Sequence, residues 1–167
     1  REMRRRVKIP IISSVNCVEP AQWVNYARKI EDAGADALEL NLYHMPVSPI
    51  ETSGQVEARN AALVQAVMSV VKLPVTVKLS QHVTALMPFA RALDGAGVKG
   101  LVLFNRFLQT DVDIEGESMF YAPNYSTPTV LHEQLRWAAV LRDWVRCDLA
   151  ISGGIHSGAE LVKALLV

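Results

Sequence analysis

The clearest alternation of apolar and polar side chains in the chain runs over residues 37–43. One face of this segment carries Leu38, Leu40 and Leu42, and the other face carries Glu39, Asn41 and Tyr43. A period of two over a short run bounded by glycine and proline predicts a β-strand. The leucine face suits packing under helices, whereas a carboxylate and a carboxamide suit the inside of a barrel or a ligand crevice.

Four further short apolar runs alternate with helical patterns along the chain. The predicted strands cover residues 9–17, 37–43, 74–80, 100–107 and 148–155. Apolar residues at helical spacing follow them over residues 19–34, 55–71, 86–97, 127–141 and 157–167. Residues 108–125 are predicted to form a long connection. Five strand–helix units in succession predict parallel strands joined by right-handed crossovers.

Two α/β architectures have this alternation. An eight-unit barrel usually needs about 250 residues, and the chain has 167. We therefore interpret residues 1–167 as one partial domain, the central part of an incomplete (β/α)8 TIM barrel with five strands in sequential order. The alternative is a complete five-stranded flavodoxin-like sheet, but residues 13–17 lack the Ser/Thr/Gly-rich phosphate loop expected there. The open edges of an incomplete barrel need further strands or another copy, so a homodimer is one expected assembly.

Composition narrows the class of partner. Half of the residues are hydrophobic, and 17 Lys and Arg balance 17 Asp and Glu. This composition predicts one soluble domain and gives no reason to expect nucleic acid or an anionic membrane as a partner. No apolar run reaches membrane-spanning length and no segment resembles a signal peptide, so the default compartment is the cytoplasm. Cys17 and Cys147 are expected at opposite ends of their strands, as reduced thiols.

A polar residue stands near the carboxyl end of each predicted strand. These residues are Asn16, Asn41, Lys78, Asn105 and the turn Ser152-Gly153-Gly154. In a parallel architecture these ends lie on one rim, where ligands bind. Amides donate and accept at once, which matches the imide edge of a flavin or a pyrimidine, and a lysine can stabilise negative charge on a reduced flavin. The structural alternative for Lys78 is an internal ion pair with Glu39.

The glycine turn precedes a predicted helix, so its backbone N–H groups and the helix N-terminus form a candidate phosphate-binding site. Its structural alternative is a tight strand-to-helix turn. No G-x-G-x-x-G or G-x-x-x-x-G-K-[ST] run is present, so a Rossmann dinucleotide site and a P-loop lack support. His82 and His156 are expected on the same rim, but their spacing is not that of metal ligands, and no metal site is predicted.

The ordered strand ends resemble those of the dihydroorotate dehydrogenases. The similar segments are Glu39-Leu40-Asn41-Leu42, Val77-Lys78-Leu79-Ser80, residues 100–105 and Ser152-Gly153-Gly154-Ile155. They are most similar to the class 1-like bacterial branch often labelled dihydroorotate dehydrogenase-like, with the strands aligned as the third to the seventh of the barrel. The resemblance implies an FMN cofactor and gives each polar residue of the rim a role. Asn16, Asn41 and Lys78 would contact the flavin, Ser152, Gly153 and Gly154 would meet its phosphate, and Asn41 and Asn105 would hold the dihydropyrimidine ring.

The chain departs from the family pattern beside the rim. Family members abstract a proton with a cysteine or serine on the loop after the Asn41 strand, and His44 occupies the matching position. A histidine side chain titrates near pH 6.5 in isolation, so it can act as a general base. Tyr43 replaces a small residue, Pro46 replaces a substrate-binding asparagine, and Arg106 replaces a serine or threonine.

The resemblance implies an FMN-dependent oxidoreductase acting on CH–CH bonds, which oxidises dihydroorotate to orotate in pyrimidine biosynthesis. His44 would be the base, and Lys78 would stabilise the reduced flavin. Two alternatives stay open: a flavin barrel that acts on another dihydropyrimidine, and a flavin-binding paralogue that has no catalytic activity.

Overall fold

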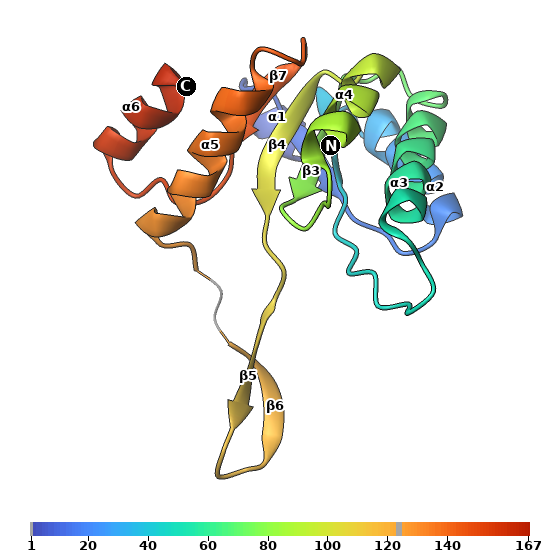
Figure 1. The fold of residues 1–167 in the computed structure, drawn as a ribbon. Coiled ribbons are helices and arrows are strands. Elements are labelled where there is room, and N and C mark those ends of the chain that lie inside the picture. Colours follow the sequence, from blue (N-terminus) through green and yellow to red (C-terminus); the bar gives the residue numbers. More distant parts are fainter. Residues whose placement is uncertain (1, 123–124) are drawn as a thin grey trace.

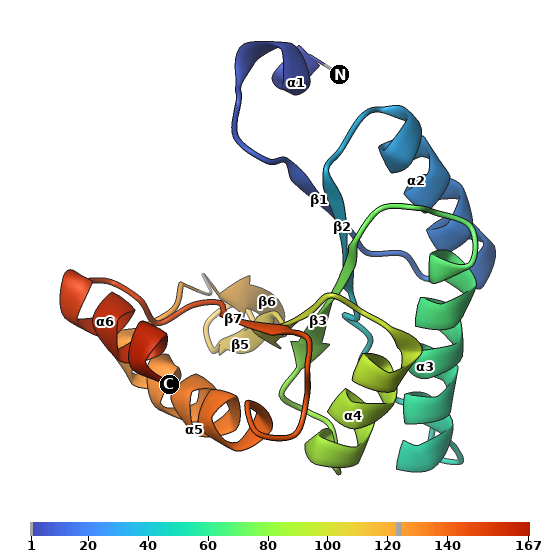
Figure 2. The same ribbon diagram turned by 90° about the horizontal axis from the view of Figure 1, so that it is seen from above.

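The computed structural model describes residues 2–122 and 125–167 and shows a curved parallel sheet with helices along its outer side (Figures 1 and 2). The sheet consists of β1 (Ile12–Val15), β2 (Ala37–Asn41), β3 (Val75–Ser80), β4 (Gly100–Asn105) and β7 (Asp148–Ile151). These strands pair in parallel in that order. The sequential order predicted for an arc of a barrel is confirmed, and the described strands do not show the reversal of order that a flavodoxin-like sheet would have.

Local sequence explains where the helices begin and end. They are α1 (Glu2–Arg6), α2 (Pro20–Asp32), α3 (Ser53–Met68), α4 (Leu86–Ala96), the short 3₁₀ turn η1 (Pro128–Val130), α5 (Leu131–Leu141) and α6 (Gly158–Leu166). Pro20 opens α2, where its missing N–H costs nothing. Thr52 and Gln55 form a reciprocal capping box at the start of α3. Gly97 ends α4 with a φ of 97°, which glycine adopts readily.

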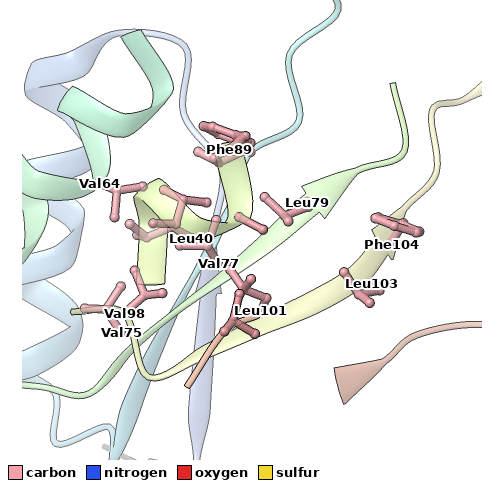
Figure 3. Packing of buried hydrophobic residues seen from close by; sticks show 14 of the residues in the cluster. Leu40, Val64, Val75, Val77, Leu79, Phe89, Val98, Leu101, Leu103 and Phe104 are labelled. Atoms are coloured by element: carbon pink, nitrogen blue, oxygen red, sulfur yellow. The ribbon is translucent and has the colours of Figure 1, made fainter. Parts of the chain in front are cut away.

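The hydrophobic core lies between the convex face of the sheet and the helices (Figure 3). The sheet contributes alternate residues, which include Leu38, Leu40, Val75, Val77, Leu79, Leu101 and Leu103. The helices contribute Trp23, Val64, Phe89 and Ala138. Because neighbouring strand residues point to opposite faces, this burial leaves Glu39, Asn41 and Lys78 on the concave face.

Residues predicted as a long connection form a β-hairpin instead. Strands β5 (Gln109–Asp113) and β6 (Ser118–Ala122) pair in an antiparallel ribbon that projects away from the sheet (Figure 1). Nearly all of its side chains are exposed. The long connection was predicted, but the hairpin within it was not, because exposure on both faces leaves no alternation of apolar and polar residues. Residues 123–124 of that connection lie outside the described part of the chain.

Replacing Leu40 with alanine is expected to lower the free energy of unfolding by about 3 kcal/mol, because the cavity left by a buried leucine is only partly refilled. Leu40 is fully buried beneath the helices, whereas Leu165, which is 76% exposed on α6, provides a matched control. Denaturant unfolding of Leu40→Ala and Leu165→Ala measures the difference. Equal unfolding midpoints for the two variants would contradict this account of the core.

Candidate functional site

Three asparagines at the ends of β1, β2 and β4 meet around Asn41. The side-chain amide of Asn105 donates a hydrogen bond to Asn41 Oδ1 at 2.8 Å, and Asn16 Nδ2 donates to the backbone oxygen of Asn41 at 2.9 Å. The backbone N–H of Arg106 donates to Asn105 Oδ1 at 3.0 Å, which fixes the orientation of that amide. Within the described residues, Asn41 Nδ2 has no acceptor. The network therefore leaves this donor for a ligand.

Lys78 lies on the strand next to Asn41. The two residues are in register between β2 and β3, and Lys78 is half-buried on the concave face. The predicted structural alternative, an ion pair with Glu39, is not formed in the described residues. Glu39 Oε1 accepts a hydrogen bond from the Ser14 hydroxyl at 2.7 Å. In residues 2–122 and 125–167, Lys78 makes no ion pair. Its ammonium group therefore provides a positive charge on the same face of the sheet as Asn41.

His44 lies away from this network. The chain alternates beyond the end of β2, with Leu42 buried against the helices, Tyr43 half-buried and His44 exposed. His44 lines two hollows on the helix side of the strand ends, together with Leu42 and Asn60. The structure therefore brings Asn16, Asn41, Lys78 and Asn105 to one rim but does not bring His44 to them.

An aromatic cluster beside the rim was missed by the sequence reasoning. The Tyr43 ring lies 4.8 Å from the Phe107 ring, and His82 stacks on Phe107 at 5.2 Å with an interplanar angle of 19°. The Tyr43 hydroxyl accepts a hydrogen bond from the backbone N–H of Leu108 at 2.7 Å. These contacts join the segments that follow β2, β3 and β4, and they anchor the base of the hairpin. The available signal was an aromatic residue, Tyr43 or Phe107, at the carboxyl end of each of two predicted strands.

The glycine turn after β7 packs against the start of α5. Gly153 and Gly154 have φ values of 92° and 76°, which other residues rarely adopt. A Cβ atom on Gly154 would lie 2.7 Å from the backbone nitrogen of Leu131. Gln134 on α5 is 1% exposed and donates from Nε2 to the Ser152 carbonyl at 2.6 Å, a contact that sequence reasoning did not identify. The turn therefore requires glycine for both its backbone conformation and its packing.

The N-terminus of α6 already has an anionic partner. Glu160 Oε2 accepts a hydrogen bond from the backbone N–H of His156 at 3.0 Å. Hydrogen bonds from the Ser157 side chain and from the His156 backbone lower the pKa of Glu160. A carboxylate thus occupies the position that was expected to receive a phosphate at this helix. The backbone N–H groups of Gly153 and Gly154 remain as the candidate anion donors.

In residues 2–122 and 125–167, no group of three or more His, Cys, Asp or Glu side chains is arranged to hold a metal ion. None of the described helices has the length and apolar character needed to cross a membrane. Cys17 and Cys147 are free cysteines.

Comparison with solved structures defines the class of fold. A mandelate oxidase variant with benzaldehyde aligns with a TM-score of 0.52 and 19% sequence identity, over 90% of this chain and 44% of that one. A mandelate oxidase with 3,3-difluoro-2-hydroxy-3-phenylpropionic acid gives the same values. With five sequential parallel strands and a polar rim at their carboxyl ends, the chain is an incomplete (β/α)8 TIM barrel.

Sequence comparison then identifies the family. A profile of the dihydroorotate dehydrogenase family matches residues 1–165, and the chain belongs to that family. It is 36% identical over 163 residues to a putative dihydroorotate dehydrogenase A (fumarate) of Aeropyrum pernix, covering 95% of this chain and 53% of the relative. It is 30% identical over 165 residues to the dihydroorotate dehydrogenase A (fumarate) of Lacticaseibacillus paracasei, covering 94% and 56%. The catalytic subunit of a Bacillus cytotoxicus dihydroorotate dehydrogenase B (NAD(+)) is 29% identical over 163 residues, with coverages of 93% and 52%. The chain spans about half the length of these curated relatives.

Proposed function

We propose that the protein is an FMN-dependent oxidoreductase that oxidises dihydroorotate to orotate in pyrimidine biosynthesis. The convergence of Asn41, Asn105 and Lys78 on one rim is the observation that carries the proposal. A dihydropyrimidine ring presents alternating carbonyl and N–H groups, and side-chain amides can both accept and donate hydrogen bonds to them. Membership of the dihydroorotate dehydrogenase family supports the same reaction.

The residues of the rim suit a flavin mononucleotide. Asn41 Nδ2 is a donor without a protein acceptor in the described residues, and the Lys78 ammonium has no carboxylate partner there. Gly153 and Gly154 form a turn that a side chain would obstruct, which suits close approach of a phosphate to the backbone. Bound FMN would supply the acceptor for hydride from the substrate ring. Asn16, which is bonded to the backbone at Asn41, completes the proposed cofactor contacts.

We propose His44 as the base because it occupies the loop position where the family carries its base. Its side chain lies on the helix side of the strand ends in the structure, so this role requires the loop after β2 to turn it towards the rim. Flavin reduction should then be slowed by roughly 10²-fold or more in His44→Asn, because the substitution removes the imidazole that accepts the proton. Rapid-mixing measurements between pH 5 and pH 9 test this assignment, with His132→Asn on the exposed start of α5 as the control. Reduction of His44→Asn at the parental rate would move the base elsewhere, and Cys17 and His82 are then the next candidates.

The substrate assignment is tested by turnover against several dihydropyrimidines. The purified protein is expected to show flavin absorbance and to be reduced by dihydroorotate under anaerobic conditions. Reduction by dihydrouracil or dihydrothymine in place of dihydroorotate would assign the barrel to another dihydropyrimidine. Flavin binding without reduction by any compound of the set would identify a paralogue that binds flavin and has no catalytic activity.

We further propose that the protein acts in the cytoplasm and assembles as a homodimer. Strands β1 and β7 each have one neighbour in the sheet, so each leaves one edge for further strands or a second copy. Analytical ultracentrifugation of the purified protein tests the assembly.

A further inference from the structure

A cavity of about 430 Å³ lies between helices α2 and α3 and the carboxyl ends of β1 and β2. It is behind the rim, on the side of the sheet that the helices cover. Its walls are mainly apolar and include Cys17, Val18, Trp23, Leu42 and Leu63. Trp23 is 3% exposed, so an indole ring held by the core forms part of the wall.

The polar side chains in the cavity wall include Tyr43, His44, Arg59 and Asn60. His44 and Asn60 line it, and the same two residues also line a smaller hollow of about 90 Å³ that extends towards Ser80 and His82. In the part of the chain that the structure describes, neither the side chain of His44 nor that of Asn60 makes a hydrogen bond. Both side chains can therefore donate a hydrogen bond to a molecule inside the cavity.

The cavity wall has little uncompensated positive charge with which to bind an anion. Arg59 also lines the wall, but its guanidinium forms an ion pair with Glu51. Its charge is matched within the protein, and a carboxylate in the cavity would have to compete with Glu51 for it. The remaining walls would desolvate an anion without compensating it. A neutral ligand therefore fits better than a charged one.

We propose that this cavity binds a small neutral aromatic carbonyl compound. The ring would lie among Trp23, Leu42 and Leu63, and the carbonyl oxygen would accept a hydrogen bond from Asn60. The volume falls within the range of about 300–1,000 Å³ that is typical of small-molecule pockets, at the end that suits one or two rings. The site lies on the helix side of the strand ends and includes none of Asn41, Lys78 and Asn105, although Tyr43 beside the rim forms part of its wall.

The probe for this site is 2-acetylnaphthalene, with 2-ethylnaphthalene and 2-naphthoate as matched compounds that lack the ketone or carry a charge. Cys17 reports occupancy, because its thiol lies in the cavity wall. The second thiol is removed in a Cys147→Ser background. Cys147 lies at the other end of the sheet, and burial together with nearby Asp94 raises its pKa to about 11, so it reacts slowly in any case.

The ketone is expected to slow alkylation of Cys17 by maleimide at least fivefold at saturation. The ethyl compound should bind about three- to tenfold more weakly, because it lacks the hydrogen-bonded oxygen. Naphthoate should bind more weakly still. Leu63→Trp, which fills the cavity, should abolish protection.

Asn60→Leu tests the polar end independently. It should weaken binding of the ketone about three- to tenfold and leave binding of the ethyl compound unchanged. If Leu63→Trp does not fold, Asn60→Leu alone tests whether the ketone binds in the cavity. Absence of protection, or equal affinities for the ketone and the ethyl compound, would overturn the proposal. Flavin absorbance recorded on the same samples reports on the rim, so a failure of flavin binding is seen separately.

Discussion

Replacement of Lys78 by methionine is expected to leave FMN bound while slowing reduction of the flavin by roughly 10²–10³-fold. The ammonium group lies in register with Asn41 on the concave face and has no carboxylate partner in the described residues. It can therefore stabilise negative charge that develops on the flavin ring. Methionine keeps the unbranched stem and removes only the charge. Anaerobic single-turnover reduction by dihydroorotate measures the rate.

Lys99→Met provides the matched control for that measurement. Lys99 follows α4 at the amino end of β4, which is the opposite end of the sheet from the rim. The same change of side chain there should leave the rate of flavin reduction unaltered. Equal rates for Lys78→Met and the parent protein would remove Lys78 from the mechanism.

Substitution of Gly154 by alanine is expected to abolish FMN binding and to lower the free energy of unfolding by at least about 2 kcal/mol. The residue has a φ of 76°, and its new Cβ atom would lie 2.7 Å from the backbone nitrogen of Leu131. To remove this clash, either the glycine turn or the start of α5 must move. Either movement displaces the N–H groups proposed to bind the phosphate. Flavin fluorescence titration and denaturant unfolding measure the two effects.

Gly158→Ala is the control for this substitution. Gly158 is the first residue of α6, and its backbone is not in the left-handed region. A Cβ atom added to it would have no other atom within 4 Å. Alanine is therefore expected to be tolerated there, with FMN affinity unchanged. If Gly154→Ala binds FMN like the parent, the glycine turn is not the phosphate site.

The order of elements was predictable because each strand–helix unit repeats the same simple pattern. Alternation in β2, proline at the start of α2 and glycine after α4 each specify local structure without tertiary information. The hairpin of β5 and β6 was not predictable in this way. Its side chains are exposed on both faces, so burial imposes no pattern of period two on its sequence.

The residues of the rim were predictable because parallel strands bring their carboxyl ends together. Their mutual contacts were not predictable. The hydrogen bond from Asn105 to Asn41 joins residues 64 positions apart in the chain, and it depends on the register of three strands. The orientation of His44 was likewise beyond the sequence pattern, because the loop after Asn41 has no regular period. Gln134 was overlooked because a single glutamine within an amphipathic helix resembles an exposed residue.

The sequential order of the sheet also bears on how the chain folds. Each of the pairs β1–β2, β2–β3 and β3–β4 is formed by strands separated by a single helix, so each pairing closes a short stretch of chain. Such a chain can add one strand–helix unit at a time as it leaves the ribosome, because each new strand pairs with the one made just before it. The pairing of β4 with β7 is different, because the hairpin must first be looped out between them. Formation of that last pairing is therefore expected to be the slowest step in assembling the sheet.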